Sequence, residues 1–435
     1  MERFIVDELL TWKDQTRRKP LVVRGARQVG KTWSIVNFGR EQFDAVHVVD
    51  LERRPEWHRI FAGDLVAAEM LSELEVFLNA RIEPGRDLLF IDEIQSCPRA
   101  ITALRYFYED CPDLHVIAAG SLLEFATRDV SFPVGRVQFL EMGPMCFAEF
   151  LLATDRGRLA EIVAMPPERQ PDSVHALLME GVRRYMFVGG MPECVAAYAE
   201  TGRLREAFEV QAELVNAYRE DFAKYTPQVN RHCLNAVLAS VARSVGRQTK
   251  YANLAEGFSN PTIKKGFDLL CLARVVRKVR AASPSGLPLG AGASERKFKA
   301  LVVDIGLMQH LCGMQVEVEY ARTDLLAIFQ GALAEQFVGQ ELAAAGQSEL
   351  FYWAREARNS SAEVDYLTAI DGRTRPVEVK GGAAGRLKSL HLLLKTFPDC
   401  APGYVFSGAP YAELPEQRLV FVPLYGVYGA MRGRP

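Results

Sequence analysis

One stretch decides the fold of the first part of the chain: Leu21-Val-Val-Arg-Gly25-Ala-Arg-Gln-Val-Gly30-Lys31-Thr32. Its second half fits the pattern G-x-x-x-x-G-K-[ST], preceded by an apolar strand and followed by a helix. The glycines let the loop wrap so that backbone N–H groups point at phosphate oxygens, and the helix presents its positive end to them. Lys31 then reaches the β- and γ-phosphates, and the Thr32 hydroxyl binds Mg²⁺. ATP and Mg²⁺ are therefore the expected ligands, and the expected contacts come from Gly25, Arg27, Gln28, Val29, Gly30, Lys31, Thr32 and Trp33.

A second motif lies 92 − 31 = 61 residues after the lysine, where the apolar run Leu88-Leu-Phe-Ile ends in Asp92 and Glu93. The carboxyl end of such a strand lies beside the phosphate loop in a parallel sheet, where Asp92 holds Mg²⁺. Glu93 suits a base that orients the attacking water. Alone, the motif would indicate only a buried strand with an acidic turn; the upstream loop favours a nucleotide site.

Two further polar residues adjoin the later apolar runs. Ser121 follows the expected strand from His115 to Ala119, which ends in Gly120-Ser121, and suits contact with the γ-phosphate or the lytic water, although a simple helix N-cap explains it equally well. Arg136 precedes the run from Val137 to Leu140 and suits a catalytic arginine that reaches a neighbouring subunit's site. A surface arginine in a turn is the alternative, and Arg128 is a weaker candidate for the same role. Because an arginine supplied in trans requires head-to-tail contact, a ring, and specifically a hexamer, is expected.

The segment from Tyr251 to Leu270 is similar to a winged helix-turn-helix. The pattern predicts a first helix over 253–256 and a second over 262–271, capped by Ser259-Asn-Pro261. The second helix exposes Lys264 and Lys265, and the basic residues Arg274, Arg277, Lys278 and Arg280 follow it. Contact with DNA phosphates is expected, and use of the domain for protein packing alone is the alternative.

Near the C-terminus, Asp365 and Glu378-Val-Lys380 match a D…E-x-K nuclease signature with a spacing of 378 − 365 = 13 residues. Asp371-Gly372 predicts the tight turn of a hairpin between them, and Glu335 stands where an early acidic residue is expected. Asp365 and Glu378 would hold a metal ion on the scissile phosphate, with Lys380 steadying the attacking hydroxide. A solvated hairpin with ordinary surface charges is the alternative.

Composition narrows the class of protein only modestly. The 435 residues are 49% hydrophobic with a formal net charge of -2, so nucleic-acid contact must come from local patches. The eight cysteines form no CxxC pair and indicate core residues in a reducing compartment. The charged N-terminus and the absence of an apolar run of about 20 residues favour a cytoplasmic protein without a membrane partner.

Taken together, the motifs resemble those of bacterial and archaeal AAA+ ATPases that carry a C-terminal PD-(D/E)xK nuclease-like domain of unknown function. The resemblance rests on Gly25 to Thr32, Phe90-Ile-Asp-Glu-Ile-Gln95, Ala119-Gly-Ser-Leu-Leu123, Val134-Gly-Arg136 with Phe147-Ala-Glu-Phe150, and Gly189-Gly-Met-Pro192. Some relatives carry a Gln/Tyr helix motif after the signature lysine, where this chain has Arg386-Leu-Lys388. This departure weakens the expectation of cleavage and leaves DNA binding intact.

The resemblance implies an α/β chain in four parts: a P-loop AAA+ core over 1–145, a helical lid over 146–225, a winged helix-turn-helix over 226–319 and an α+β nuclease-like domain over 320–435. The expected function is an ATP-hydrolysing, oligomeric motor that acts on branched or duplex DNA, with Holliday-junction-like substrates among the candidates. A nucleotide-gated nuclease or a signalling or defence NTPase is one alternative, and a protein-binding ATP switch is the other.

Overall fold

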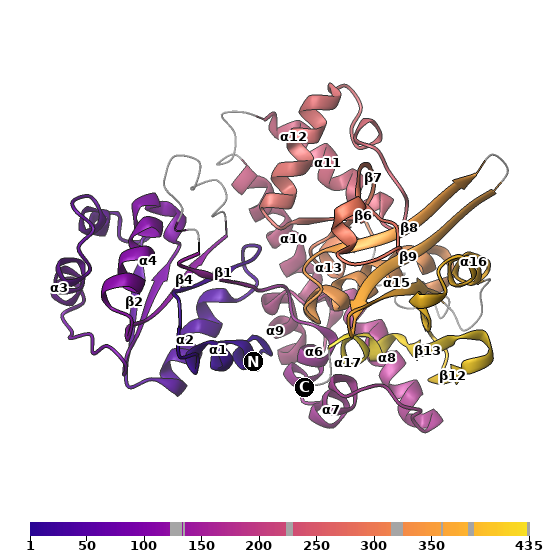
Figure 1. The fold of residues 1–435 in the computed structure, drawn as a ribbon, viewed down its shortest axis with the longest axis horizontal. Helices are drawn as coiled ribbons and strands as arrows, with labels where there is room; N and C mark the ends of the chain where they lie inside the picture. The colour runs from indigo at the N-terminus through magenta and orange to yellow at the C-terminus, as the bar shows by residue number, and fades with distance from the viewer. Residues whose placement is uncertain are drawn as a thin grey trace. The chain divides into compact units, whose positions relative to one another are not determined.

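The computed structural model describes residues 1–121, 133, 135–222, 229–314, 325–357, 360–381 and 387–432. The chain forms two compact units (Figure 1). The N-terminal unit contains residues 3–143 and 272–274, and the C-terminal unit contains residues 1–2, 144–271 and 275–435. Arg128 and the helix expected after Ser121 fall on residues 122–132, which lie outside the described residues.

The sheet of the N-terminal unit is parallel throughout the described strands and has the order β2-β3-β4-β1-β5. Its strands are β1 (Leu21–Arg24), β2 (Val46–Asp50), β3 (Leu88–Asp92), β4 (His115–Gly120) and β5 (Gln138–Glu141). β1, β3, β4 and β5 coincide with the apolar runs described above, so the expected α/β class with a parallel sheet is confirmed. β3 and β4 are buried along their whole length, which explains their uninterrupted apolar sequence.

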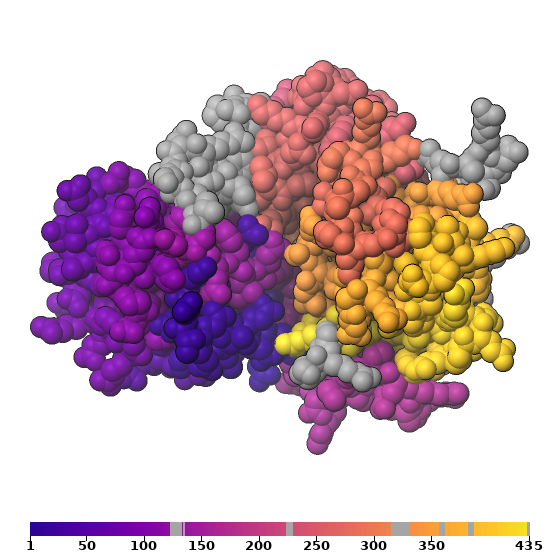
Figure 2. All heavy atoms as spheres, viewed as in Figure 1, coloured from indigo at the N-terminus to yellow at the C-terminus, as the bar shows by residue number. Residues whose placement is uncertain are grey.

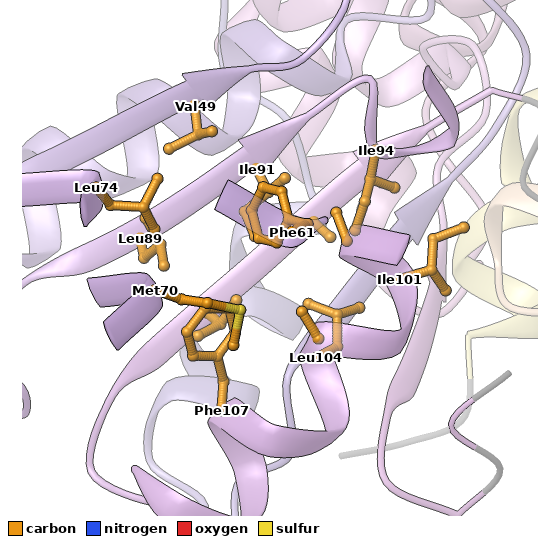
Figure 3. Packing of buried hydrophobic residues seen from close by; sticks show 14 of the residues in the cluster. Val49, Phe61, Met70, Leu74, Leu89, Ile91, Ile94, Ile101, Leu104 and Phe107 are labelled. Carbon is orange, nitrogen blue, oxygen red and sulfur yellow. The ribbon is translucent and has the colours of Figure 1, made fainter. Parts of the chain in front are cut away.

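Helices alternate with these strands: α1 (Ile5–Lys13), α2 (Lys31–Gln42), the 3-10 helix η1 (Pro55–Phe61), α3 (Ala67–Leu78), the 3-10 helix η2 (Ile94–Ser96) and α4 (Pro98–Asp110). One core of this unit lies between the sheet and the helices α3 and α4 (Figure 3). Leu89 and Ile91, on alternate positions of β3, meet Met70 of α3 and Leu104 and Phe107 of α4 there. This packing fixes β3, and with it the two carboxylates that end the strand.

The first half of the C-terminal unit is helical. It contains α6 (Phe147–Ala153), α7 (Gly157–Ala164), α8 (Asp172–Val188), α9 (Pro192–Thr201), α10 (Leu204–Asp221), α11 (Arg231–Ser244), the 3-10 helix η5 (Tyr251–Asn253) and α12 (Asn260–Leu272). The first helix expected over 253–256 is wrong, because that stretch leaves η5 within a few residues and reaches Gly257 at a φ of 79°. The second helix is present as α12, and the Ser259 hydroxyl accepts the Thr262 N–H at 3.4 Å as a cap.

The second half of this unit surrounds a mixed sheet with the order β12-β13-β11-β10-β9-β8-β6-β7. The strands are β6 (Val276–Ala281), β7 (Ser294–Val302), β8 (Leu350–Ala357), β9 (Ser360–Ile370), β10 (Arg373–Val379), β11 (Gly403–Ser407), β12 (Ala412–Leu414) and β13 (Leu419–Pro423). Its helices are η6 (Leu289–Gly292), α13 (Ile305–Leu311), α15 (Leu325–Ala344), α16 (Lys388–Thr396), η7 (Pro398–Cys400), η8 (Pro415–Gln417), η9 (Leu424–Gly426) and α17 (Val427–Met431). The β9–β10 hairpin turns at Asp371 and Gly372, both with positive φ, as expected.

The hairpin β6–β7 belongs to the same sheet as the C-terminal strands, because β6 pairs with β8 in parallel. In the space-filling view the two stretches share one continuous surface (Figure 2). Residues 276–302, placed by the sequence in a winged helix, and residues 350–423, placed in a nuclease-like domain, are thus built into one sheet. The four-part division of the chain remains a prediction.

The helical stretch expected to form a lid packs against α15 of the same unit. The rings of Phe147 and Tyr185 both lie edge-on to Phe337, and the Phe147 N–H donates to Glu341 Oε1 at 2.9 Å. The segment Gly189-Gly-Met-Pro192 is also explained by packing. The Gly190 N–H donates to Asp304 Oδ2 at 2.6 Å, and a Cβ at Gly190 would lie 2.0 Å from the Met145 carbonyl oxygen.

Candidate functional site

The loop between β1 and α2 has the shape that its glycines require. Gly30 caps α2 with a φ of 92°, and Gln28 also has a positive φ of 61°. A Cβ at Gly25 would lie 2.0 Å from the carbonyl oxygen of Met142, so any side chain there would displace the backbone. The sequence of this loop therefore specifies a tight wrap around the start of α2.

Lys31, Thr32 and Asp92 meet at the mouth of this loop. Thr32 Oγ1 donates to Asp92 Oδ2 at 2.7 Å, which joins the loop to the end of β3. The buried Lys31 ammonium donates to the carbonyl oxygens of Gly25 at 3.1 Å and Ala26 at 2.7 Å. Its pKa is lowered to about 8 by burial, against the opposing charges of Glu93 and Asp92. Burial likewise raises the pKa of Asp92 to about 6.

Glu93 lies one residue beyond Asp92 in a left-handed conformation, with a φ of 47°. Its N–H donates to Asp92 Oδ1 at 3.0 Å, and its carboxylate accepts a hydrogen bond from the side-chain amide of Gln95. A positive φ is unusual for a residue other than glycine, and such backbone conformations occur often at functional sites.

The remaining loop residues differ in exposure. Val29 is fully buried, whereas Trp33 in the first turn of α2 is 48% exposed. Arg27 is half-buried beside the loop. A hydroxyl and a carboxylate in contact, next to a lysine bound only to backbone carbonyls, fit a Mg²⁺–phosphate ligand, because Mg²⁺ takes one or two protein oxygens and completes its shell from phosphate and water.

Ser121 and Arg136 occupy opposite ends of the sheet. Ser121 directly follows β4, and its buried hydroxyl has no hydrogen-bond partner among the described residues. Arg136 lies two residues before Gln138, the first residue of β5, which pairs with Leu21 at the start of β1. Its Nε donates to Glu109 Oε1 at 2.8 Å. Since the phosphate loop follows the far end of β1, Arg136 lies at the edge of the sheet away from its own loop.

Arg3 is a contributor that the sequence motifs did not reveal. Its buried guanidinium donates to the Val29 carbonyl oxygen at 2.8 Å and to the Gly143 carbonyl oxygen at 2.8 Å. Arg3 therefore ties the loop to the segment after β5. Both contacts are made to backbone atoms, 26 and 140 residues away in the sequence, so no local sequence pattern predicts this role of Arg3.

Two of the expected nuclease carboxylates, Glu335 of α15 and Asp365 of β9, come together with Glu363 around a lysine. Lys299 Nζ of β7 lies 2.7 Å from Glu335 Oε1, 2.6 Å from Glu363 Oε1 and 3.4 Å from Asp365 Oδ1. Glu378 is 6% exposed, and its Oε1 accepts from Lys380 at 2.6 Å. Burial raises the pKa of Glu378. The solvated hairpin is excluded, and the described residues contain no group of His, Cys, Asp or Glu arranged to hold a metal ion.

The basic residues expected to contact DNA divide into two sets. Lys264 and Lys265 are exposed on α12. In contrast, Lys278 pairs with Glu295, and Arg280 pairs with Glu295 and Glu349. Arg277 donates to the Ser348 carbonyl oxygen at 2.8 Å, and Arg274 pairs with Glu141 at 2.8 Å. The basic run of the sequence is therefore largely neutralised within the chain.

Fold and loop together define the first part of the chain as a P-loop nucleotide-binding domain. Residues 17–151 match the family model described as AAA domain, so this part of the chain is similar to that family. Residues 179–317 and 330–425 match two families described only as domains of unknown function, DUF8612 and DUF4143. No curated protein matches the chain.

Three solved structures resemble the chain at low identity. A Walker-type ATPase of Pyrococcus abyssi has 14% identity and a TM-score of 0.44, covering 71% of this chain and 95% of its own. The Aeropyrum pernix ORC1 protein in complex with DNA has 12% identity and a TM-score of 0.29, with 71% and 90% covered. The Thermotoga maritima RuvB Holliday junction branch migration motor has 16% identity and a TM-score of 0.32, with 68% and 93% covered. Nothing about activity or partners follows from similarities this distant.

No helix in the described part of the chain is both long and apolar enough to cross a membrane.

Proposed function

We propose that the N-terminal unit hydrolyses ATP at the mouth of the loop. The observation that carries the proposal is the 2.7 Å hydrogen bond between Thr32 Oγ1 and Asp92 Oδ2, which brings the two Mg²⁺-binding positions together beside a buried lysine. Mg²⁺, when bound, neutralises charge that develops on the transferred phosphoryl group.

The chain's own residues perform the remaining tasks. Lys31 exchanges the carbonyl oxygens of Gly25 and Ala26 for phosphate oxygens, which suits an ammonium that burial has stripped of water. Glu93 accepts a hydrogen bond from the attacking water, and Gln95 holds the Glu93 carboxylate in place. The unpartnered hydroxyl of Ser121 suits contact with the same water or the γ-phosphate.

The test compares wild type with Glu93→Gln, and with Glu69→Gln as a control on the exposed face of α3. Glu93→Gln is expected to lower turnover by about 10²–10⁴-fold while ATP binding persists, because the base is lost and the phosphate contacts remain. Glu69→Gln should match wild type in both measurements. A wild-type protein that ignores ATP at millimolar magnesium would end the proposal.

We propose further that the active form is a head-to-tail ring, a hexamer, in which Arg136 serves the neighbouring site. Its position at the edge of the sheet away from its own loop supports this, since only another subunit's loop is then within its reach. Lys31→Ala and Arg136→Ala should each be inactive alone. Mixing them should restore part of the activity, because a mixed pair contains one intact loop facing one intact arginine. Mixtures as inactive as their components would exclude a shared site.

DNA is the partner that we propose for this ATPase, either duplex or branched. The support is the exposed pair Lys264 and Lys265 on α12, which suits phosphate contact without base readout. ATP turnover should rise with at least one of duplex, single-stranded or four-way-junction DNA. Turnover that is indifferent to all three, measured at low salt where phosphate contacts are strongest, would contradict DNA action.

A protein-binding ATP switch is the second candidate. It is favoured by the internal pairing of Lys278 and Arg280 with Glu295 and Glu349, which removes charge from the expected DNA-facing surface. This candidate predicts no retention on DNA even at low salt. For either function we propose a cytoplasmic location, supported by the eight cysteines, which form no disulfide bond.

A further inference from the structure

Lys299 is an ammonium buried among carboxylates. It projects from β7, and its side chain is 1% exposed. Glu335 of α15 and Glu363 and Asp365 of β9 supply its three acidic partners, at 2.7, 2.6 and 3.4 Å. Its Nζ also lies 5.4 Å from the ring centroid of the buried Tyr352. One positive charge therefore lies between Glu335 and Asp365, two of the acidic residues of the nuclease signature.

Two carboxylates of the nuclease signature make further hydrogen bonds within the protein. Asp365 Oδ2 accepts the Val379 N–H at 2.8 Å, and Glu378 Oε1 accepts from Lys380 at 2.6 Å. Glu335 Oε2 lies against Gly246, where even a Cβ would approach it to 2.9 Å. Glu378 Oε2 is buried and lacks a hydrogen-bond partner among the described residues. To bind these oxygens, a divalent ion would have to displace the Lys299 ammonium from Glu335 and Asp365, and the Lys380 ammonium from Glu378.

We propose that Lys299 takes the place of the divalent cation in the C-terminal carboxylate cluster, so that this domain does not cleave nucleic acid. The ammonium is attached to the chain and hydrogen-bonded in place, so it neutralises the carboxylates without being diluted or exchanged. Metal-dependent hydrolysis needs an ion that polarises the phosphate and lowers the pKa of a bound water. A lysine whose donors all point at carboxylates supplies neither, and Lys380 is left pairing with Glu378.

The inference has a structural counterpart. Lys299 belongs to the segment matched as one domain of unknown function, and Glu335, Glu363 and Asp365 belong to the segment matched as the other. The same ion pairs that replace the metal therefore fasten β7 to α15 and β9. The acidic residues of the nuclease signature thus have a structural role in a site that does not cut.

The experiment measures Mn²⁺ binding by electron paramagnetic resonance, with nucleotide-free full-length chain in an Asp92→Asn background that silences the loop site. The parent should bind no Mn²⁺ at the cluster. Lys299→Met should gain one Mn²⁺ ion per chain, and adding Asp365→Asn to it should remove that ion again. Lys395→Met, an exposed lysine of α16, is the matched control and should behave as the parent. A Lys299→Met chain that folds and gains no ion overturns the proposal.

A second measurement keeps the proposal testable if Lys299→Met does not fold. Wild type and Asp365→Asn are compared for Mn²⁺ binding and for nicking of supercoiled DNA with Mg²⁺ or Mn²⁺. Equal, background values for both proteins support the proposal. Mn²⁺ binding or nicking by wild type that Asp365→Asn abolishes overturns it, and would restore the nucleotide-gated nuclease as the better reading. Neither readout depends on ATP hydrolysis.

Discussion

The two units each place a lysine beside strand-borne carboxylates, with opposite results. Lys31 donates to the backbone carbonyls of Gly25 and Ala26, and the nearby Asp92 is held by a neutral hydroxyl. Lys299 donates directly to carboxylates. Burial lowers the pKa of Lys31 to about 8, whereas three acidic neighbours outweigh burial and raise the pKa of Lys299. A lysine near carboxylates is therefore not enough to make an anion-binding site. The ammonium must also be free of ion pairs with those carboxylates, as that of Lys31 is and that of Lys299 is not.

The largest expected effect is the loss of stability on replacing Lys299, the lysine that is paired with carboxylates. Lys299→Met should lower the free energy of unfolding by about 3–5 kcal/mol, because it leaves buried carboxylates without their counter-charge. Chemical denaturation in metal-free buffer measures this, and Lys395→Met should stay within about 0.5 kcal/mol of wild type. A loss for Lys299→Met as small as that of the control would show that the cluster is not held by its lysine.

Replacing Lys31 should instead lower activity and leave stability nearly unchanged. Lys31→Met should lower ATP turnover by about 10²–10³-fold, since it removes a preorganised charge from the phosphates. Its stability should match or slightly exceed that of wild type, because a lysine whose pKa is depressed by burial costs folding free energy while charged. Thermal melting beside steady-state kinetics checks both halves, and marked destabilisation would make Lys31 as structural as Lys299.

Acid should affect the N-terminal unit through His115. Burial, with help from Arg18 and Lys13, lowers the pKa of His115 to about 4. Between pH 6.5 and 4, His115 is protonated in the unfolded chain and neutral in the folded chain. The free energy of unfolding therefore falls as the pH drops through that window, by up to about 3 kcal/mol. His115→Phe, which keeps a ring against Trp12 and Phe43, should flatten the dependence. His391→Phe, at an exposed site, should leave it unchanged.

The smallest expected effect concerns the surface of the C-terminal unit. Replacing Lys264 and Lys265 together by Gln should weaken DNA retention and reduce the slope of log affinity against log salt by about 1–2, as two phosphate contacts are lost. Lys395→Gln should not change the slope. A fluorescence anisotropy titration at several salt concentrations distinguishes the two, and equal slopes would favour the protein-binding switch.

The sequence predicts the N-terminal unit well because its determinants are local. A loop that wraps at Gly25 and Gly30, and a strand that ends in Asp92, each need only a few neighbouring residues, and the parallel sheet then brings them together. The β9–β10 turn was predictable for the same reason, since Asp371 and Gly372 tolerate positive φ.

The carboxylate cluster around Lys299 was not predictable, because its ion pairs join residues that are far apart in the sequence. Lys299 stands in the ordinary basic stretch Arg296-Lys-Phe-Lys299, and its partners lie 36, 64 and 66 residues further on. Nothing in the stretch indicates which lysine faces inward. The short helix expected over 253–256 does not form, because the chain leaves the 3-10 helix η5 after Asn253 and reaches Gly257 with a positive φ.

The helix α15 has a practical consequence for anyone who cuts this chain into pieces. Gln336 binds both backbone groups of Val302, Gln340 accepts the Ile305 N–H, and Glu341 accepts the Phe147 N–H. A fragment that begins near residue 320 would keep all of these side chains and discard everything they hold. Shortened proteins of the C-terminal unit should therefore start before Phe147. Later starting points leave the polar side chains of α15 without their hydrogen-bond partners.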